Sequence, residues 1–159
     1  NYLADLDIPD ISIKWPNDIY IAKKKVAGML THNSFLGDSL ENSIIGIGLN
    51  VNQMQFKSDA PNPISLQMIS HQEYLLEEEW DKVLQSIYTQ VIRLASGDFE
   101  ELDKDYLNRL FQFNIEAKYE DETGVYTGKI IGVDEYGQLT IEKNNGEQLN
   151  YGIKEVVFL

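Results

Sequence analysis

Three charged side chains in the first part of the chain have types and spacing that suit a ligand-binding site. Lys14 and Asp18 flank a short Trp-Pro-Asn segment, and Lys25 is the last of three consecutive lysines before the apolar residues 26–30. A lysine that leads directly into a strand projects from a rigid element, and a fixed ammonium group can neutralise an anionic ligand. Spacing alone leaves a second interpretation open, in which the three lysines only solvate a turn.

The elements that must position these side chains are predicted to form a hairpin over residues 11–30. Apolar alternation at Ile11 and Ile13 leads into the segment, and residues 19–21 are a short β-prone run. Pro16 interrupts any continuous central strand because proline donates no hydrogen bond to a neighbouring strand. We therefore expect an irregular point in the sheet between Lys14 and Asp18, where a ligand can reach the backbone.

The run Lys-Trp-Pro-Asn-Asp-Ile-Tyr-Ile-Ala-Lys-Lys-Lys-Val-Ala-Gly-Met-Leu at residues 14–30 resembles a family signature. It is similar to the Lys-Trp-Pro-Asn-Asp…Lys-x-Ala-Gly-(Ile/Met)-Leu motif of bacterial biotin protein ligases (biotin–acetyl-CoA-carboxylase ligases). The resemblance implies ATP-dependent formation of biotinyl-5′-adenylate, followed by transfer of biotin to a lysine of a biotin carboxyl carrier protein. It also implies ATP and biotin as substrates and Mg²⁺ as cofactor. The absence of cysteine fits a cytoplasmic location.

The same resemblance implies roles for individual residues. Lys25 is similar to the catalytic lysine that holds the biotin carboxylate and the α-phosphate, Lys14 to a lysine that contacts the phosphates, and Asp18 to a carboxylate that helps to hold Mg²⁺. The expected biotin contacts are Lys25, Gly28, Gly46, Ile47 and Gly48, and the expected nucleotide contacts are Lys14, Asn17 and Asn50.

Several of these residues have ordinary structural explanations as well. Gly46 and Gly48 alternate with isoleucines in an apolar strand, and such a pair marks a bulge at least as readily as a close approach by a ligand. Asn50 could be a turn residue. His32 and His71 lack ligand-like spacing, so we interpret them as surface histidines.

One part of the family pattern is missing. The Gly- and Arg-rich phosphate-clamping loop (G-R-G-x-x-G type) lies upstream of the Lys-Trp-Pro-Asn-Asp motif in the family, and nothing in this sequence matches it. Arg93 and Arg109 lie downstream in helical regions. The resemblance therefore covers the second half of a catalytic domain, and we expect this chain alone to be inactive or weakly active. A non-catalytic ligase-like binding module and a lipoate-attaching relative are the alternatives.

Composition restricts the classes of protein to consider. The formal net charge of −13 argues against non-specific nucleic-acid binding. The chain has no cysteine, which excludes disulfides and thiolate sites. No apolar run approaches membrane-spanning length. The chain begins at Asn1 without a methionine, which we interpret as the middle of a longer protein; a short protein whose initiator methionine was processed is the alternative. A homodimer is possible.

The resemblance implies an α+β fold, with a mixed sheet and packed helices followed by a small SH3-like β-barrel. The five short strands at the end of the chain by themselves predict a small closed barrel or a sandwich. The expected domains are residues 1–111, the C-terminal part of the catalytic domain, and residues 112–159, the barrel. Three- and four-residue apolar spacing predicts the helices, and turn signals such as Asn-Gly separate the short strands. The expected elements are the end of a helix at 1–8, a polar turn region at 31–41, a strand at 43–52, a loop-rich segment at 53–70 with Ser65 as a cap, helices at 72–95 and 99–110, and strands at 115–119, 125–133, 139–142, 148–151 and 155–159.

Overall fold

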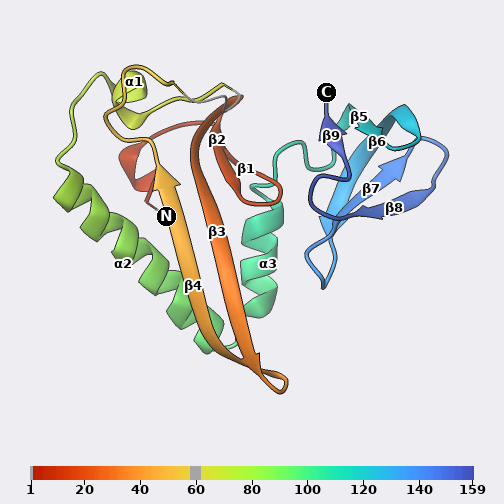
Figure 1. Cartoon of the computed structure of the whole chain (residues 1–159), viewed down its shortest axis with the longest axis horizontal. Helices are drawn as coiled ribbons and strands as arrows, with labels where there is room; N and C mark the ends of the chain where they lie inside the picture. Colours follow the sequence, from red (N-terminus) through yellow and green to blue (C-terminus); the bar gives the residue numbers. More distant parts are fainter. Residues whose placement is uncertain (1, 58–61) are drawn as a thin grey trace. The chain divides into compact units, whose positions relative to one another are not determined.

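The computed structural model describes residues 2–57 and 62–159. Parts of the segments predicted at 1–8 and 53–70 therefore lie outside the described residues. The chain divides into two compact units, Asn1–Phe99 and Glu100–Leu159 (Figure 1). This division is one of contact clusters, and the domain boundary expected between residues 111 and 112 stays a prediction.

The first unit is built on an antiparallel sheet with the strand order β1-β2-β3-β4. The α+β class is confirmed, but both sheets of the chain are antiparallel where the sequence predicted a mixed sheet. Parallel pairing in the described residues is limited to isolated bridges such as Lys25 with Pro63. The strands are β1 (Ile11–Lys14), β2 (Asp18–Ile21), β3 (Lys24–Leu36) and β4 (Ser39–Leu49).

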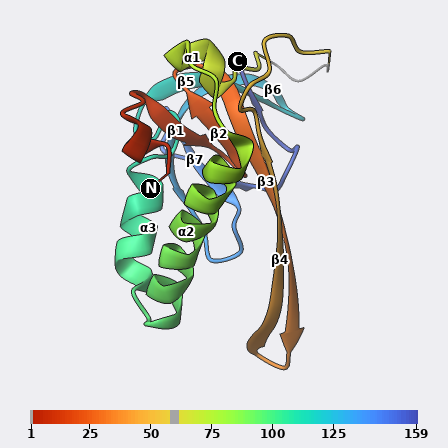
Figure 2. The same ribbon diagram turned by 90° about the vertical axis from the view of Figure 1, so that its left-hand side faces the viewer.

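The two long strands correct the prediction of a polar turn region at residues 31–41. Hydrogen-bonded pairing continues from Thr31 opposite Ile45 to Leu36 opposite Ser39, and the turn is confined to the residues around Gly37, whose φ is 61°. Polar residues are tolerated in these strands because both faces of the outer hairpin are exposed. Figure 2 shows β3 and β4 continuing past β1 and β2 as a two-stranded ribbon.

One face of the sheet carries the core of the first unit. Val26 and Leu66 are fully buried, and Ile21, Ala27 and Val51 are nearly so. Burying an aliphatic side chain of this size contributes roughly 1.5–3 kcal/mol, so this small cluster is a main source of stability for the unit. The 3₁₀ helix η1 (Ala4–Leu6), found where the end of a helix was predicted, lies next to core residues Tyr2 and Leu3.

Helices close the first unit on the core side. In α1 (Leu66–Ser70) the Ser65 hydroxyl accepts a hydrogen bond from the Met68 amide at 3.2 Å, which confirms the predicted cap. Helix α2 (Leu76–Ala95) begins four residues later than predicted and buries Glu79 and Val83. Gly97, with φ of 81°, follows its end as expected.

The second unit contains α3 from Glu100 onward (α3 spans Phe99–Leu107) and an antiparallel sheet with the order β8-β7-β6-β5-β9. Tyr119, Ile130, Leu139 and Ile141 are completely buried at its centre. The described pairings do not join β8 to β9, so the predicted barrel is not confirmed. The strands are β5 (Glu116–Asp121), β6 (Gly124–Val133), β7 (Leu139–Lys143), β8 (Gln148–Tyr151) and β9 (Val157–Phe158).

Among the described helices, none combines the length and the apolar character that crossing a membrane requires.

Candidate functional site

The three charged residues predicted to act together lie on one face of the first sheet. Lys14 and Asp18 are directly opposite each other in the β1–β2 pair, so their side chains point to the same side. Across the β2–β3 pair, the Lys25 Nζ lies 2.6 Å from the Asp18 Oδ1. The two side chains are 29% and 27% exposed, so the ion pair is open to a ligand from solvent.

A β-bulge at Val26 brings Lys25 to this face. Ile19 pairs with Ala27 but Tyr20 pairs with Lys25, which leaves Val26 as an extra residue in β3. Without the bulge, Lys25 and Gly28 would point to opposite faces, because side chains alternate along a strand. With it, Val26 and Ala27 are buried in the core, while Lys25 points to the face that carries Asp18.

The backbone of Lys25 is held from the other side by the segment before α1. Its amide donates to the Asn62 carbonyl at 2.9 Å, and its carbonyl accepts from the Ile64 amide at 2.9 Å. The Asn50 side chain reinforces this contact, donating to the Ile64 carbonyl at 3.1 Å and to the Lys25 carbonyl at 3.4 Å. The ammonium group therefore extends from a backbone that is fixed on both edges.

Lys14 sits in a less polar setting beside the ion pair. Its Nζ lies 5.4 Å from the centre of the Tyr20 ring, and Tyr20 is only 5% exposed. Burial lowers the pKa of Lys14; Asp18 opposes this effect and the positive charge of Lys25 adds to it. Burial and the carboxylate of Asp18 raise the pKa of Tyr20. The sequence interpretation missed Tyr20 as part of this site, although its position two residues after Asp18 in a strand predicts a shared face.

A strip without side chains continues from the ion pair across β3 and β4. Gly28 is opposite both Asp18 and Gly48, and Gly46 is opposite Leu30. The register is regular through these glycines, so the bulge considered for Gly46 and Gly48 is not what the structure shows there. A Cβ atom at Gly46 or Gly48 would meet only backbone oxygen atoms, at 3.8 and 3.9 Å respectively, with nothing else within 4 Å.

Beyond the glycines the same face becomes apolar. Leu30 is 74% exposed and Ile44, opposite His32, is 70% exposed. The face thus offers charged groups at one end, bare backbone in the middle and aliphatic side chains at the other end. Such a surface suits an elongated ligand with an anionic group and a less polar body.

Other predicted site residues are engaged in the fold itself. The Asn17 side chain donates a hydrogen bond to the Met29 carbonyl, and the Met29 amide donates to the Asn17 carbonyl at 3.0 Å. Ile47 packs against the core, on the face opposite to the neighbouring glycines. The amide of Asn50 is used to hold Lys25. The contacts of these residues with biotin or nucleotide stay predictions.

The donor set near Asp18 is small. Within residues 2–57 and 62–159, no group of three or more His, Cys, Asp or Glu side chains could hold a metal ion. His32 and His71 are exposed, as expected for surface histidines. A protein site of a single carboxylate suits Mg²⁺ only when phosphate groups and water supply the other ligands.

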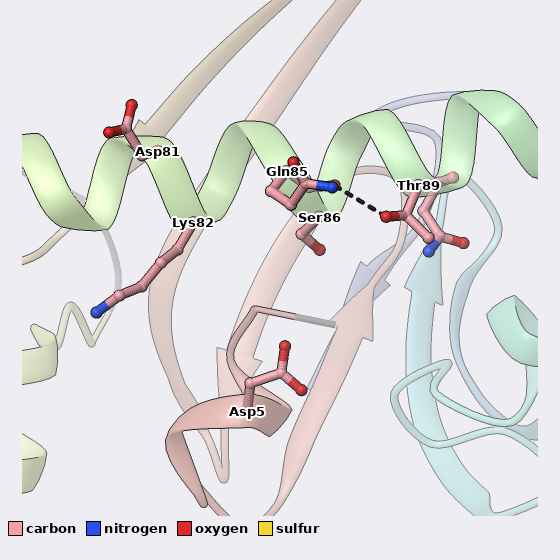
Figure 3. Close-up of a pocket in the computed structure, with 7 residues that line it drawn as sticks. Asp5, Asp81, Lys82, Gln85, Ser86 and Thr89 are labelled. Carbon is pink, nitrogen blue, oxygen red and sulfur yellow. Dashed lines mark hydrogen bonds between the residues drawn. The ribbon is translucent and has the colours of Figure 1, made fainter.

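A polar hollow between η1 and α2 lies apart from the charged face in the first unit (Figure 3). Close by, the Tyr2 amide donates to the Ser86 hydroxyl at 3.2 Å, and the Tyr2 hydroxyl donates to the buried Glu79 carboxylate at 2.5 Å. Burial works against ionisation of Glu79, but hydrogen bonds from Lys82 and Tyr2 hold its pKa below the ordinary value. We interpret this hollow as the seam where η1 meets α2. It is lined by Asp5, Asp81, Lys82, Gln85, Ser86, Thr89 and Gln90.

The part of the chain that carries the charged face matches a known protein family. Residues 7–50 match the biotin/lipoate A/B protein ligase family. This matched segment contains Lys14, Asp18, Lys25 and the glycine strip.

Individual relatives are similar in sequence to most of this chain. The bifunctional ligase/repressor BirA of Bacillus subtilis (strain 168) is 31% identical over 146 residues, which cover 84% of this chain and 42% of that protein. The biotin–acetyl-CoA-carboxylase ligase of Paracoccus denitrificans is 25% identical over 143 residues, covering 87% of this chain and 60% of that protein. The chain therefore spans less than two thirds of the length of either relative.

Solved structures give the same result for the fold. The apo structure of biotin protein ligase from Aquifex aeolicus matches 99% of this chain and 69% of its own, with a TM-score of 0.75 and 29% sequence identity. The structure of that ligase in complex with biotin and ATP also matches 99% of this chain, with a TM-score of 0.74, and is covered over 66% of its length.

Proposed function

The chain belongs to the biotin/lipoate A/B protein ligase family and spans part of the length of its relatives, and we propose that it supplies one section of a biotin protein ligase active site. The reaction would be ATP-dependent formation of biotinyl-5′-adenylate, followed by transfer of biotin to a lysine of a carboxyl carrier protein. The observation that carries the proposal is the Lys25–Asp18 ion pair, at 2.6 Å, beside the bare strip of Gly28, Gly46 and Gly48.

Lys25 has the position that the first step requires. The carboxylate of biotin and the α-phosphate of ATP repel each other, so their approach needs a positive charge held between them. A backbone fixed on both edges and a single flexible side chain let Lys25 present its ammonium group with little reorganisation. Lys14, on the same face, would add a second positive charge toward the phosphates.

The glycine strip gives the less polar part of biotin a place to lie. Because no side chain rises from Gly46 or Gly48, a ligand can approach the backbone of β4 while its carboxylate reaches Lys25. Leu30 and Ile44 then provide aliphatic contacts at the far end. Asn17 and Asn50 would act mainly by holding the turn and Lys25 in place.

Asp18 would serve as an Mg²⁺ ligand. Beside transferred phosphates, Mg²⁺ is usually bound by one or two protein carboxylates, and phosphate and water supply the remaining ligands. When bound, the metal would offset phosphate charge. Without it, the Asp18 carboxylate pairs with Lys25 and keeps its ammonium group in position.

We infer that this chain alone is a poor ligase. Its sequence contains no segment of the G-R-G-x-x-G type, and a reactive adenylate needs donors and a cover that exclude water. Such a protein would work in the cytoplasm, where ATP and carrier proteins are available.

The test is to incubate the chain with biotin, ATP, Mg²⁺ and a carrier domain, and to detect biotin on the carrier with streptavidin. A second reaction adds the part of the Aquifex aeolicus ligase that this chain does not cover. We expect weak or no labelling alone and clear labelling on complementation, with Lys25→Ala as the inactive control. Labelling by the chain alone would contradict the inferred weakness, and failure of the complemented reaction would contradict the function.

A lipoate-attaching activity is the second candidate, because the family matched by residues 7–50 includes both biotin and lipoate ligases. Competition between biotin and lipoate in the complemented reaction separates the two. Biotin should be transferred in preference; preferential transfer of lipoate would favour the alternative. Binding of biotin and ATP without any transfer would instead identify a non-catalytic module.

A further inference from the structure

We propose that Gly28 is a positioning residue whose missing side chain leaves the space in which the Lys25 ammonium and the Asp18 carboxylate meet. This inference rests on the proposed function for its catalytic consequence, but its structural part concerns only the ion pair. It gives Gly28 a role different from the direct biotin contact that the family resemblance implied.

The geometry around Gly28 is crowded on the side of the ion pair. A Cβ atom at this position would lie 3.1 Å from the Asp18 Oδ1 and 3.3 Å from both Cε and Nζ of Lys25. Carbon atoms in good contact are about 3.5–4.0 Å apart, so even one methyl group would have to displace its neighbours. Both charged side chains would be affected, because both approach the same point above Gly28.

The strand architecture explains why these groups converge there. Asp18 is the direct cross-strand partner of Gly28, and the bulge at Val26 turns Lys25 to the same face. Three residues therefore share one small area of the sheet. Two of them carry charged groups in contact, and a side chain on the third would crowd that contact.

The backbone conformation does not by itself require glycine at this position. Gly28 is not among the glycines with positive φ, in contrast to Gly37 and Gly146. The other two glycines of the strip also differ from it, since a Cβ at Gly46 or Gly48 would meet only backbone oxygen atoms, at 3.8 and 3.9 Å. The restriction at Gly28 comes from the ion pair, whereas Gly46 and Gly48 face open space.

A methyl group at residue 28 should therefore affect chemistry more than folding. The atoms it would meet are the ends of flexible, partly exposed side chains, which can move by a few tenths of an ångström. Catalysis is far more sensitive, because misplacing a reacting group by about 1 Å can reduce a rate on the order of 100-fold. We expect Gly28→Ala to fold and to move the Lys25 ammonium away from its position.

The test uses the full chain with ¹³C-labelled lysine and observes the ε-methylene signals by NMR. The Lys25 signal is identified by its loss in Lys25→Arg. Gly28→Ala should shift this signal in the same direction as Asp18→Asn, which breaks the ion pair without adding atoms. Gly132→Ala is the matched control, because Gly132 also lies in a strand and a Cβ there would meet nothing within 4 Å.

An unchanged Lys25 signal in Gly28→Ala would overturn the proposal. Loss of folding in Gly28→Ala, seen as collapse of the amide signals, would also overturn it, since the glycine would then be needed by the fold. In the complemented reaction, adenylate formation should fall on the order of tenfold or more with little change in the biotin KM. A shifted signal with no activity in the parent reaction would leave the positioning role intact and contradict the proposed function alone.

Discussion

At the residue scale, the Lys25–Asp18 pair is built for exchange with a ligand more than for stability. Both side chains keep more than a quarter of their surface exposed, and ion pairs of this kind contribute roughly 0.2–1 kcal/mol. The pair can therefore open at small cost when an anion reaches the ammonium group. The ion pair holds the Lys25 ammonium group in position before the ligand binds.

We expect Lys25→Ala to reduce adenylate formation on the order of 10²–10³-fold, because one preorganised charged contact is lost. Lys24→Ala should have little effect, since Lys24 is exposed and pairs opposite Ile21, away from Asp18. Adenylate formation by the complemented protein, measured as biotin-dependent pyrophosphate release, checks both variants. Equal losses for the two variants would contradict the assignment to Lys25.

At the element scale, β3 is fixed by a side chain that the sequence interpretation assigned to the nucleotide. The side-chain amide of Asn50 donates to two carbonyl groups, those of Lys25 and Ile64. The backbone N–H of Asn50 donates to the Val26 carbonyl at 2.9 Å. The bulge in β3 and the segment before α1 are therefore joined through one residue. Removing the Asn50 side chain should therefore affect the fold as well as the site.

Asn50→Ala should lower the free energy of unfolding by about 1–3 kcal/mol, because it leaves two partly buried carbonyl groups without this donor. Urea denaturation followed by circular dichroism measures the change. Asn42→Ala, in an exposed part of β4, the strand that ends just before Asn50, is the control and should change stability little. If Asn50→Ala unfolds like the parent chain yet loses ATP binding, the direct nucleotide role would replace the structural one.

In the second unit, the last residue of β5 carries a carboxylate held by several donors. The Asp121 carboxylate accepts hydrogen bonds from the Tyr151 hydroxyl at 2.7 Å and from the amide and hydroxyl of Thr123 at 2.8 and 2.6 Å. The hydrogen bonds from Thr123 and Tyr151 lower the pKa of Asp121 to about 2. Burial raises the pKa of Tyr151, and its hydrogen bonds with Tyr126 and Asp121 add to this effect.

This lowered pKa predicts a pH dependence of stability. The folded state binds fewer protons than the unfolded state between pH of about 2 and the ordinary aspartate value of about 4, so stability falls as pH decreases through this window. Asp121→Asn should be less stable than the parent at neutral pH, with the difference narrowing toward pH 2. Thermal unfolding from pH 7 to pH 2 checks this, with the exposed Glu122→Gln as control, which should stay close to the parent throughout.

At the scale of the whole molecule, the β3–β4 hairpin of the first unit exposes several large apolar side chains. Leu30, Leu36 and Ile44 are each at least 70% exposed on the β3–β4 hairpin, and Phe35 is 62% exposed. In the described part of the sheet, β4 also ends the strand order and presents an edge. Exposed edges and apolar patches of this kind favour association.

We expect the isolated chain to self-associate as its concentration rises. Sedimentation velocity should show a concentration-dependent increase in average mass, and the double variant Leu36→Lys/Ile44→Lys should reduce it. Val125→Lys/Tyr136→Lys adds the same charge at exposed apolar residues of the second unit and is the control. An equal reduction by both double variants would show that charge, and not this hairpin surface, governs association.

Local sequence patterns were sufficient for features that depend on nearby residues. Apolar spacing predicted α2, Ser65 was recognised as a cap, and the Asn-Gly turn appears at Gly146 with φ of 85°. The motif around Lys25 resembles the signature of the family that residues 7–50 match. Each of these signals depends on neighbours a few residues away, so it can be recognised from the amino-acid sequence alone.

The arrangement of the site depended on contacts between distant segments. Only the tertiary structure shows the bulge at Val26 that turns Lys25 toward Asp18, the use of Asn50 to hold Lys25, and the crowding that distinguishes Gly28 from Gly46. The physical reason is that strand register is set by the partner strand and its packing, and a shift of one residue reverses the face of every side chain. The sequence by itself determined which groups could do the chemistry, and the register determined which of them meet.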